Sequence, residues 1–151
     1  MYRSIVAGTD GSATALEAVR HAGALAAACD ARLTVVSAYR PMTAAAVLAM
    51  SSAVGAVALD TTQLAEEQRQ DAVEILEHAV MSLGVFGVQT STRAEAGDAA
   101  EVLLAVAADE QADLLVVGNR GMSGARRFLL GSVPNRVAHH ADCSVLVVHT
   151  C

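Results

Sequence analysis

The strongest constraint on the fold is a regular alternation of short apolar runs with longer helical stretches. Runs rich in β-branched and other apolar residues occupy 4–8, 32–38, 87–93, 113–118 and 144–149. Strands that read as continuous apolar runs are typical of parallel sheets, whose strands are joined by right-handed helical crossovers. The pattern therefore predicts an α/β fold with helices on both faces of the sheet. We expect the two most apolar runs, 4–8 and 113–118, to lie in its middle.

Four helices are predicted between these runs. Ser12 is a suitable N-cap for a helix over residues 12–29, and a second helix with an apolar stripe covers 61–83. A third helix begins at Asp98 and a fourth begins with Ser132 as its N-cap. Serine and aspartate accept hydrogen bonds from the first amides of a helix, so all three residues mark helix starts.

The segment 39–60 is long, rich in alanine and unusually apolar, and its length indicates a specific role as a loop or as an additional helix. Its most apolar stretch, 44–59, contains two serines and a glycine. A membrane-spanning helix needs about 18 to 20 apolar residues, so this stretch is too short. We expect no membrane partner.

The amino-acid composition of the chain excludes several classes of function. A chain of 151 residues fits a single domain, 1–151, and a net charge of −6 argues against non-specific binding to nucleic acid. All ten basic residues are arginine, which excludes a Walker-type phosphate lysine and a Schiff-base lysine. Three cysteines without a CxxC pair, and an N-terminus without a signal-peptide pattern, favour the reducing cytoplasm.

The segment after the run 113–118 has the composition of an anion-binding loop. Residues 114–141 contain no Asp or Glu in an otherwise acidic chain, and they include four arginines: Arg120, Arg126, Arg127 and Arg136. Glycines allow backbone amides to approach a ligand closely, and this loop has three: Gly118, Gly121 and Gly124. Gly131 and Ser132 then begin a helix, whose N-terminus attracts anions. We therefore predict a phosphate site here.

A second loop, "GTDGS" at residues 8–12, follows the first strand. Ligands of open α/β sheets bind at the carboxyl ends of the strands, so the two loops should converge there. Asp10 could accept hydrogen bonds from ribose hydroxyls or bind a Mg²⁺ ion that is held by phosphates. Alternatively, its carboxylate could form an Asx turn within its own loop. The strand 32–38 ends at Ala38, whose small side chain leaves room for a flat base.

These stretches resemble the universal stress protein family. The sequence "GNRGMSGARRFLLGS" fits the family's adenine-nucleotide signature G-x2-G-x9-G-[ST], with Gly118, Gly121, Gly131 and Ser132 in register. "IVAGTDGS" is similar to the family's first strand and Asp-bearing loop, and "LLVVGNRG" to its fourth strand. The likeness covers the whole chain as a single universal stress protein domain. The Ala-rich, Lys-free composition resembles that of members from high-GC actinobacteria.

The resemblance implies a five-stranded parallel sheet in the order 3-2-1-4-5, Rossmann-like and similar to the adenine nucleotide alpha hydrolases. It implies a regulatory, stress-response protein that binds ATP at the ends of strands 1 and 4, and a homodimer formed through the edge strand 144–149. The implied cofactor-binding residues are Gly8, Thr9, Asp10, Ala38, Gly118, Asn119, Arg120, Gly121, Gly124, Gly131, Ser132 and Val133. Asp10 would contact the ribose or hold Mg²⁺.

Four alternatives arise on sequence grounds. Cyclic AMP is a second candidate ligand, and slow ATP hydrolysis is a second candidate activity. No general base is identifiable beside the predicted phosphate site, so we expect a binding protein and no enzyme. A nucleotidyl-transfer enzyme of related fold would need an HxGH motif or a pyrophosphate loop, and "GTDGSA" supplies neither. A purely structural dimer with an empty pocket is disfavoured by the intact glycine signature.

Overall fold

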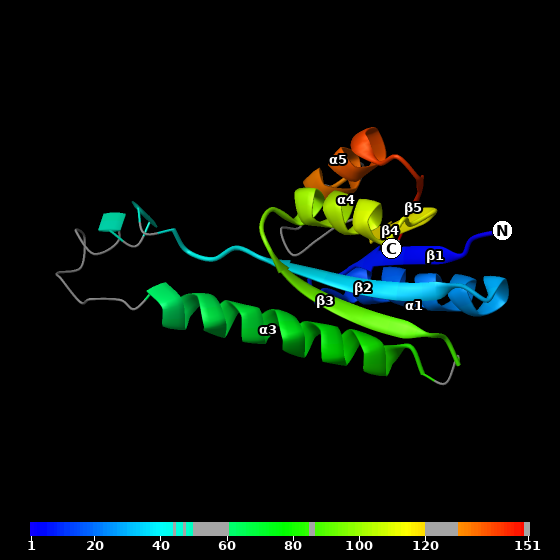
Figure 1. The fold of residues 1–151 in the computed structure, drawn as a ribbon, viewed down its shortest axis with the longest axis horizontal. Helices are drawn as coiled ribbons and strands as arrows, with labels where there is room; N and C mark the ends of the chain where they lie inside the picture. The colour runs from blue at the N-terminus through cyan, green and yellow to red at the C-terminus, as the bar shows by residue number, and fades with distance from the viewer. Residues whose placement is uncertain (44, 47, 50–60, 85–86, 120–129, 150–151) are drawn as a thin grey trace.

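Five parallel strands form one sheet in the order β3-β2-β1-β4-β5, as the family resemblance implies (Figure 1). The computed structural model describes residues 1–43, 45–46, 48–49, 61–84, 87–119 and 130–149. The elements along the chain are β1 Ser4–Gly8, α1 Ala13–Cys29, β2 Arg32–Tyr39, α3 Thr61–Ser82, β3 Thr90–Ala96, α4 Ala99–Asp109, β4 Leu114–Gly118, α5 Ser132–His140 and β5 Ser144–Val148.

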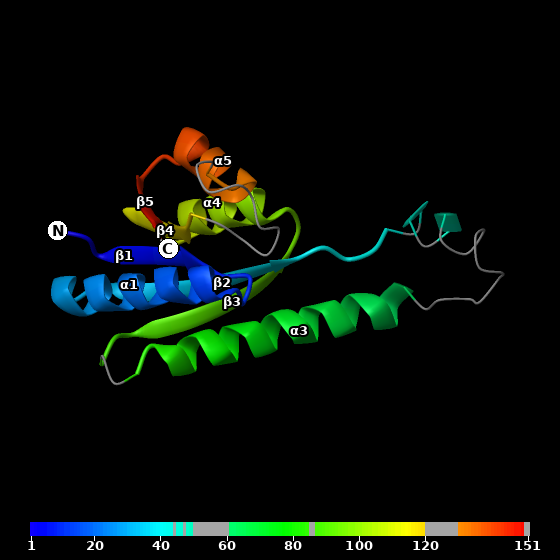
Figure 2. The same ribbon diagram turned by 180° about the vertical axis from the view of Figure 1, so that it is seen from behind.

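Helices cover both faces of the sheet, as predicted. α1 and α3 lie on one face, and α4 and α5 lie side by side on the other (Figures 1 and 2). Successive strand residues point to opposite faces, so Ile5 and Ala7 pack in the core under α1 and α3, while Val6 packs under α4 and α5. Every residue of β1 and β4 is buried, which confirms that the two most apolar runs are central strands.

Two of the predicted helix starts are confirmed in detail. The Ser12 side chain accepts a hydrogen bond from the Ala15 amide and caps α1. Asp98 caps α4 by accepting from the amides of Ala100 and Glu101. These bonds satisfy backbone donors that have no partner within the helix.

The predicted N-cap of α5 is wrong by one residue. Gly131, and not Ser132, is the N-cap, and as a glycine it makes no side-chain hydrogen bond to the helix. Gly131 has the extended backbone of an N-cap, and its carbonyl already accepts the helical hydrogen bond from the Asn135 amide. Ser132 is therefore the first residue inside the helix.

The predicted strand 87–93 begins three residues too early, because β3 spans Thr90–Ala96. Gly87 has a φ of +63°, a left-handed conformation that interrupts a strand. Pairing with β2 starts only at Thr90, which lies opposite Leu33. β3 is an edge strand whose residues, TSTRAEA, are mostly polar, so the limits of the predicted run do not mark its bounds.

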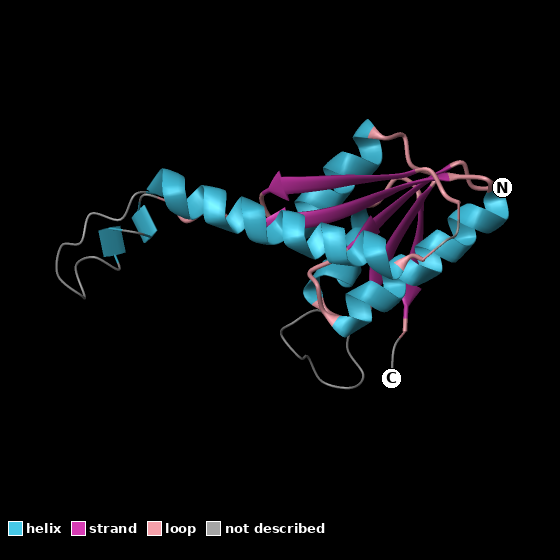
Figure 3. Cartoon of the chain, turned by 90° about the horizontal axis from the view of Figure 1, so that it is seen from below, coloured by secondary structure: helices cyan, strands magenta, loops and turns pink. Residues whose placement is uncertain are grey.

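α3 extends well beyond the sheet at its N-terminal end (Figures 1 and 3). Its buried residues, Ala72, Leu76 and Ala79, all lie in the C-terminal half, which packs on β2 and β3. Of the preceding segment 39–60, positions 44, 47 and 50–60 lie outside the described residues. Among the helices that are described, none has the length and apolar character needed to cross a membrane.

Asp113 lies at the amino ends of the strands, opposite their carboxyl ends, and it connects the start of β4 to the start of β1. Its carboxylate accepts hydrogen bonds from the amides of Arg3 and Ser4, at 2.9 and 3.2 Å. Partial burial acts to raise the pKa of Asp113, but these hydrogen bonds outweigh it, and the pKa lies below its ordinary value.

We expect the stabilising effect of Asp113 to depend on pH. Because its folded-state pKa is depressed, the contribution is full above the ordinary pKa of 3.8 and is lost as pH falls through the folded pKa. Urea denaturation of wild type and Asp113→Asn should therefore show a difference in unfolding free energy at neutral pH that shrinks in acid. A difference that stays constant with pH would contradict this account.

Candidate functional site

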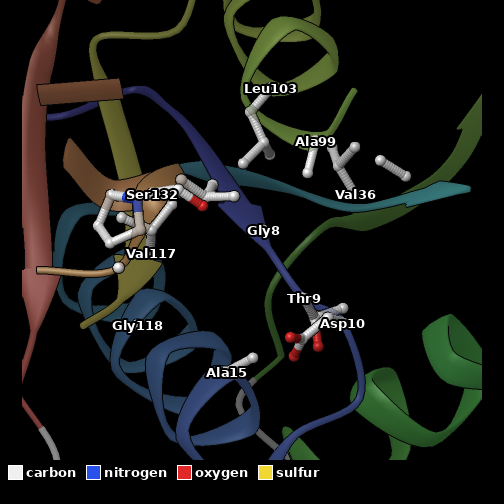
Figure 4. A pocket seen from close by; sticks show the side chains of 14 residues that line it. Gly8, Thr9, Asp10, Ala15, Val36, Ala99, Leu103, Val117, Gly118 and Ser132 are labelled. Carbon is white, nitrogen blue, oxygen red and sulfur yellow. The ribbon is translucent and has the colours of Figure 1, made fainter. Parts of the chain in front are cut away.

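A pocket of about 290 Å³ lies at the carboxyl ends of β1, β2 and β4 (Figure 4). Eight of the residues predicted to bind nucleotide line it: Gly8, Thr9, Asp10, Ala38, Gly118, Gly131, Ser132 and Val133. Six further lining residues were not predicted: Ala15, Val36, Ala99, Leu103, Val117 and Pro134. The loop after β1, the end of β4 and the start of α5 therefore converge on one pocket.

Asn119 does not line the pocket, although it is buried at the end of β4. Its amide donates to the Val148 carbonyl at 2.9 Å, its carbonyl accepts from the Gly131 amide at 3.1 Å, and its side-chain nitrogen lies 2.9 Å from His149 Nδ1. Asn119 thus joins β4 to β5 and to the start of α5. The other predicted site residues, Arg120, Gly121 and Gly124, lie outside the described residues.

The loop after β1 is fixed by its own polar side chains. The Thr9 amide donates to the Val36 carbonyl at 2.9 Å, which ties the loop to β2. The Asp10 carboxylate accepts from the Ser12 amide at 3.0 Å, so the Asx turn that the sequence allowed is present. A carboxylate has several acceptor positions, so this turn leaves Asp10 able to contact a ligand as well.

Gly118 is required by a close approach between β4 and the first turn of α1. A Cβ atom at this position would lie 3.0 Å from the Thr14 carbonyl oxygen, which belongs to the backbone and cannot rotate away. Gly8 has a related role, because a Cβ there would lie 2.8 Å from the Leu103 side chain, which reaches across from α4 (Figure 4). Both glycines let neighbouring elements close around the pocket.

Gly131 is a glycine that packing does not require. Its φ of −58° and ψ of 164° are open to any residue, and a Cβ atom would meet only ordinary contacts, at 3.5 Å or more. Its amide donates to Asn119, and the next two residues, Ser132 and Val133, supply the first amides of α5 at the pocket. Pro134 has no N–H. The first turn of α5, whose leading amides have no acceptor within the helix, therefore borders the pocket, and no cap hydrogen bond comes from the side chain of its N-cap residue.

Arg136 does not serve an anion in the way that the composition of 114–141 suggested. Its guanidinium donates to Asp98 at 2.6 Å and to Glu101 at 3.3 Å, so two carboxylates of α4 hold it. Arg40 also pairs with Asp98. Partial burial acts to raise the pKa of Asp98, but the Glu101 amide and the two arginines outweigh it, and the pKa lies below its ordinary value.

The pocket combines an apolar wall with a polar end. Val36, Leu103 and Val117 supply branched aliphatic side chains suited to a flat ring (Figure 4). The first turn of α5 supplies amides suited to a phosphate, at the positive end of the helix dipole. Within the described residues no group of three His, Cys, Asp or Glu is placed to hold a metal ion by itself.

The residues that sequence reasoning missed come mostly from helix faces. Ala99 and Leu103 belong to the apolar side of α4, and Pro134 to the first turn of α5. In the sequence such residues look like ordinary core positions. Only the packing of α4 beside α5 shows that they border a cavity.

Comparison with known proteins identifies the family. The model of the universal stress protein family matches residues 1–149. A universal stress protein of Mycobacterium tuberculosis is 38% identical over 149 residues, which are 99% of this chain and 97% of the relative. One from Methanocaldococcus jannaschii is 34% identical over 149 residues, which are 98% and 82% of the two chains. The chain belongs to the universal stress protein family, as its motifs indicate.

Solved structures agree with this assignment. A universal stress protein crystallised in complex with cyclic AMP is 35% identical, with a TM-score of 0.73 and 99% of each chain covered. The universal stress protein UspA of Lactobacillus plantarum has a TM-score of 0.78 over 97% of each chain. At 22% identity that second likeness concerns the fold alone.

Gly118 and Gly131, two of the three glycines that line the pocket, should respond differently to replacement by alanine. Gly118→Ala forces a Cβ against the Thr14 carbonyl, and we expect it to lower the free energy of unfolding by about 1 to 3 kcal/mol. Gly131→Ala should cost less than about 1 kcal/mol, the difference between glycine and alanine as N-caps. Urea denaturation of both variants makes the comparison. A larger loss for Gly131→Ala would show that packing does require this glycine.

Proposed function

We propose that the protein binds an adenine nucleotide and acts as a regulatory module in a stress response. The observation that carries the proposal is the uncapped start of α5, which opens into an apolar-walled pocket at the carboxyl edge of the sheet. The base would lie against Val36 and Leu103, near Ala38. The phosphate would accept hydrogen bonds from the amides of Ser132 and Val133.

ATP and cyclic AMP are both candidate ligands. The related universal stress protein at 35% identity was crystallised with cyclic AMP, which supports that ligand as the alternative to ATP. Arg120, Gly121 and Gly124 remain proposed ligand contacts on the strength of the glycine signature. Asp10 would contact the ribose or, with ATP, hold a phosphate-bound Mg²⁺ ion, since hard oxygen ligands suit that ion.

A binding role suits the site better than catalysis. Asp10 is the one titratable side chain among the described lining residues, and its carboxylate already accepts from the Ser12 amide. Any hydrolysis of ATP should therefore be slow. Cys29 and Cys143 are unpaired thiols, which supports a cytoplasmic location, because the cytoplasm keeps thiols reduced.

The Ser132 amide can be tested by a pair of variants at that position. Ser132→Pro removes the amide hydrogen and the hydroxyl. The helix should tolerate this change, because proline is favoured at the first helical residue and Gly131 already has the extended backbone that a residue before proline adopts. Ser132→Ala removes the hydroxyl and keeps the amide. Calorimetric titration with ATP and with cyclic AMP should show about tenfold or greater weakening for Ser132→Pro and a smaller loss for Ser132→Ala.

Wild-type affinity in Ser132→Pro would contradict the proposed phosphate site. The melting temperature of each variant without nucleotide serves as the control. It should stay close to that of the wild type, so that a change in affinity reports on the pocket and not on the fold.

We also propose a homodimer formed through β5. The two edges of the sheet differ, because β3 carries the charged residues Arg93 and Glu95, whereas the sequence of β5 is SVLVV. Charged side chains protect an edge strand from pairing, and an apolar edge without them invites it. Val145 and Val147 are only partly buried within the single chain. A partner strand would cover them.

Replacing Val147 by arginine should separate the dimer. Light scattering during size-exclusion chromatography should give twice the chain mass of 15.5 kDa for the wild type and the single mass for Val147→Arg. Thr92→Arg, on the exposed side of the other edge strand, is the matched control and should remain dimeric. A monomeric wild type would rule out the proposed dimer.

A further inference from the structure

Asp98 lies where three segments that border the pocket meet. It precedes Ala99, a lining residue, and it caps α4 through hydrogen bonds of 3.2 and 3.3 Å from the first amides of that helix. The same carboxylate accepts from Arg136 at 2.6 Å and from Arg40. One side chain therefore combines a helix cap with two ion pairs.

The two arginines come from the two other segments. Arg40 follows β2, two residues beyond the lining residue Ala38. Arg136 lies on α5, one turn after Ser132, whose amide faces the proposed phosphate position. Asp98 consequently joins the end of β2 and the first half of α5 to the start of α4. These are the segments on either side of the space that a nucleotide would fill.

Other contacts hold the same segments in part. The Gly97 amide donates to the Tyr39 carbonyl at 2.8 Å, which ties the turn before α4 to β2 through backbone atoms alone. α5 is anchored in the core by Pro134 and Val137, both buried. Between α4 and α5, however, the polar connection in the described residues consists of Arg136 with Asp98 and Glu101. This network is therefore the polar link that adds to the apolar packing between the two helices.

The exposure of the network indicates what it can contribute. The side chains of Arg40 and Arg136 are 74% and 42% exposed, whereas that of Asp98 is 23% exposed. Exposed ion pairs add little to global stability. A binding site is far more sensitive to position, because small displacements of its walls weaken several ligand contacts at once. The network should therefore affect ligand affinity more than the stability of the fold.

We propose that Asp98 is a positioning residue for the nucleotide site. Through Arg40 and Arg136 it holds the end of β2, α4 and the first turn of α5 at the spacing that the bound nucleotide needs, without itself contacting the nucleotide. This inference rests on the proposed function of the pocket, and it assigns to the rim of the pocket a residue outside the glycine signature.

Asp98→Asn tests the proposal selectively. Asparagine is as good an N-cap as aspartate, so α4 keeps its cap while both ion pairs lose their charge. Calorimetry with ATP and with cyclic AMP should show about three- to tenfold weaker binding of the preferred nucleotide. Asp113→Asn is the matched control. The Asp113 carboxylate also accepts hydrogen bonds from backbone amides, but it lies at the amino ends of the strands, away from the pocket. Its affinity should equal that of the wild type.

A double-mutant cycle separates positioning from general destabilisation. Arg136→Gln should weaken binding in the same direction, and the double variant Asp98→Asn with Arg136→Gln should bind no more weakly than Asp98→Asn alone, because the two residues act together. Additive losses, or an equal loss in Asp113→Asn, would overturn the proposal. Wild-type affinity in Asp98→Asn would overturn it as well.

Two further results keep the test decisive. If Asp98→Asn fails to fold, the exposed variants Arg40→Gln and Arg136→Gln replace it, and wild-type affinity in both would overturn the proposal. A wild-type protein that binds neither ATP nor cyclic AMP would instead contradict the proposed function itself. Binding by the wild type with unchanged affinity in the variants would contradict only the role of Asp98.

Discussion

The reversal of strand order between β1 and β4 is the constraint on which the rest of the structure depends. β1 pairs with β2 on one side and with β4 on the other, so the chain leaves their carboxyl ends in different directions. α1 packs on one face and α4 on the other, and Ala15 of α1 and Leu103 of α4 border the pocket between them. The pocket is the space that this topology leaves open.

Glycines then determine how closely the neighbouring elements approach the pocket. Gly118 allows β4 to approach α1, and Gly8 makes room for Leu103, so these two glycines serve the packing of the protein around the pocket. Gly131 meets no such demand, and it is the N-cap of a helix for which it supplies no side-chain hydrogen bond. α1 and α4, by contrast, are capped by Ser12 and Asp98. The starts of all three helices border the pocket, through Ala15, Ala99 and Ser132, and α5 is the one among them whose N-cap residue makes no side-chain hydrogen bond.

The sequence predicts those parts of the fold that are set by local chemistry. β1 and β4 are apolar throughout because they are buried on both faces of the sheet. Ser12 and Asp98 are N-cap residues, so they indicate where their helices begin. The predicted bounds of β3 are wrong because its sequence, TSTRAEA, is mostly polar, so that no apolar run marks where the strand begins and ends. The partners of Asp98 could not be predicted, since Arg40 and Arg136 lie 58 and 38 residues away and only the fold brings them together. The contribution of α4 to the apolar wall of the pocket could not be predicted either, because only the fold brings Leu103 to the ends of the strands.

The central claim is that the open start of α5 receives the phosphate of an adenine nucleotide. It is tested most directly by following the backbone amide resonances of Ser132 and Val133 by nuclear magnetic resonance during titration with ATP or cyclic AMP. The account predicts large, saturable shifts at both amides, together with shifts of the Leu103 methyl groups. Saturable binding that leaves these resonances unmoved and shifts those of another surface would contradict it.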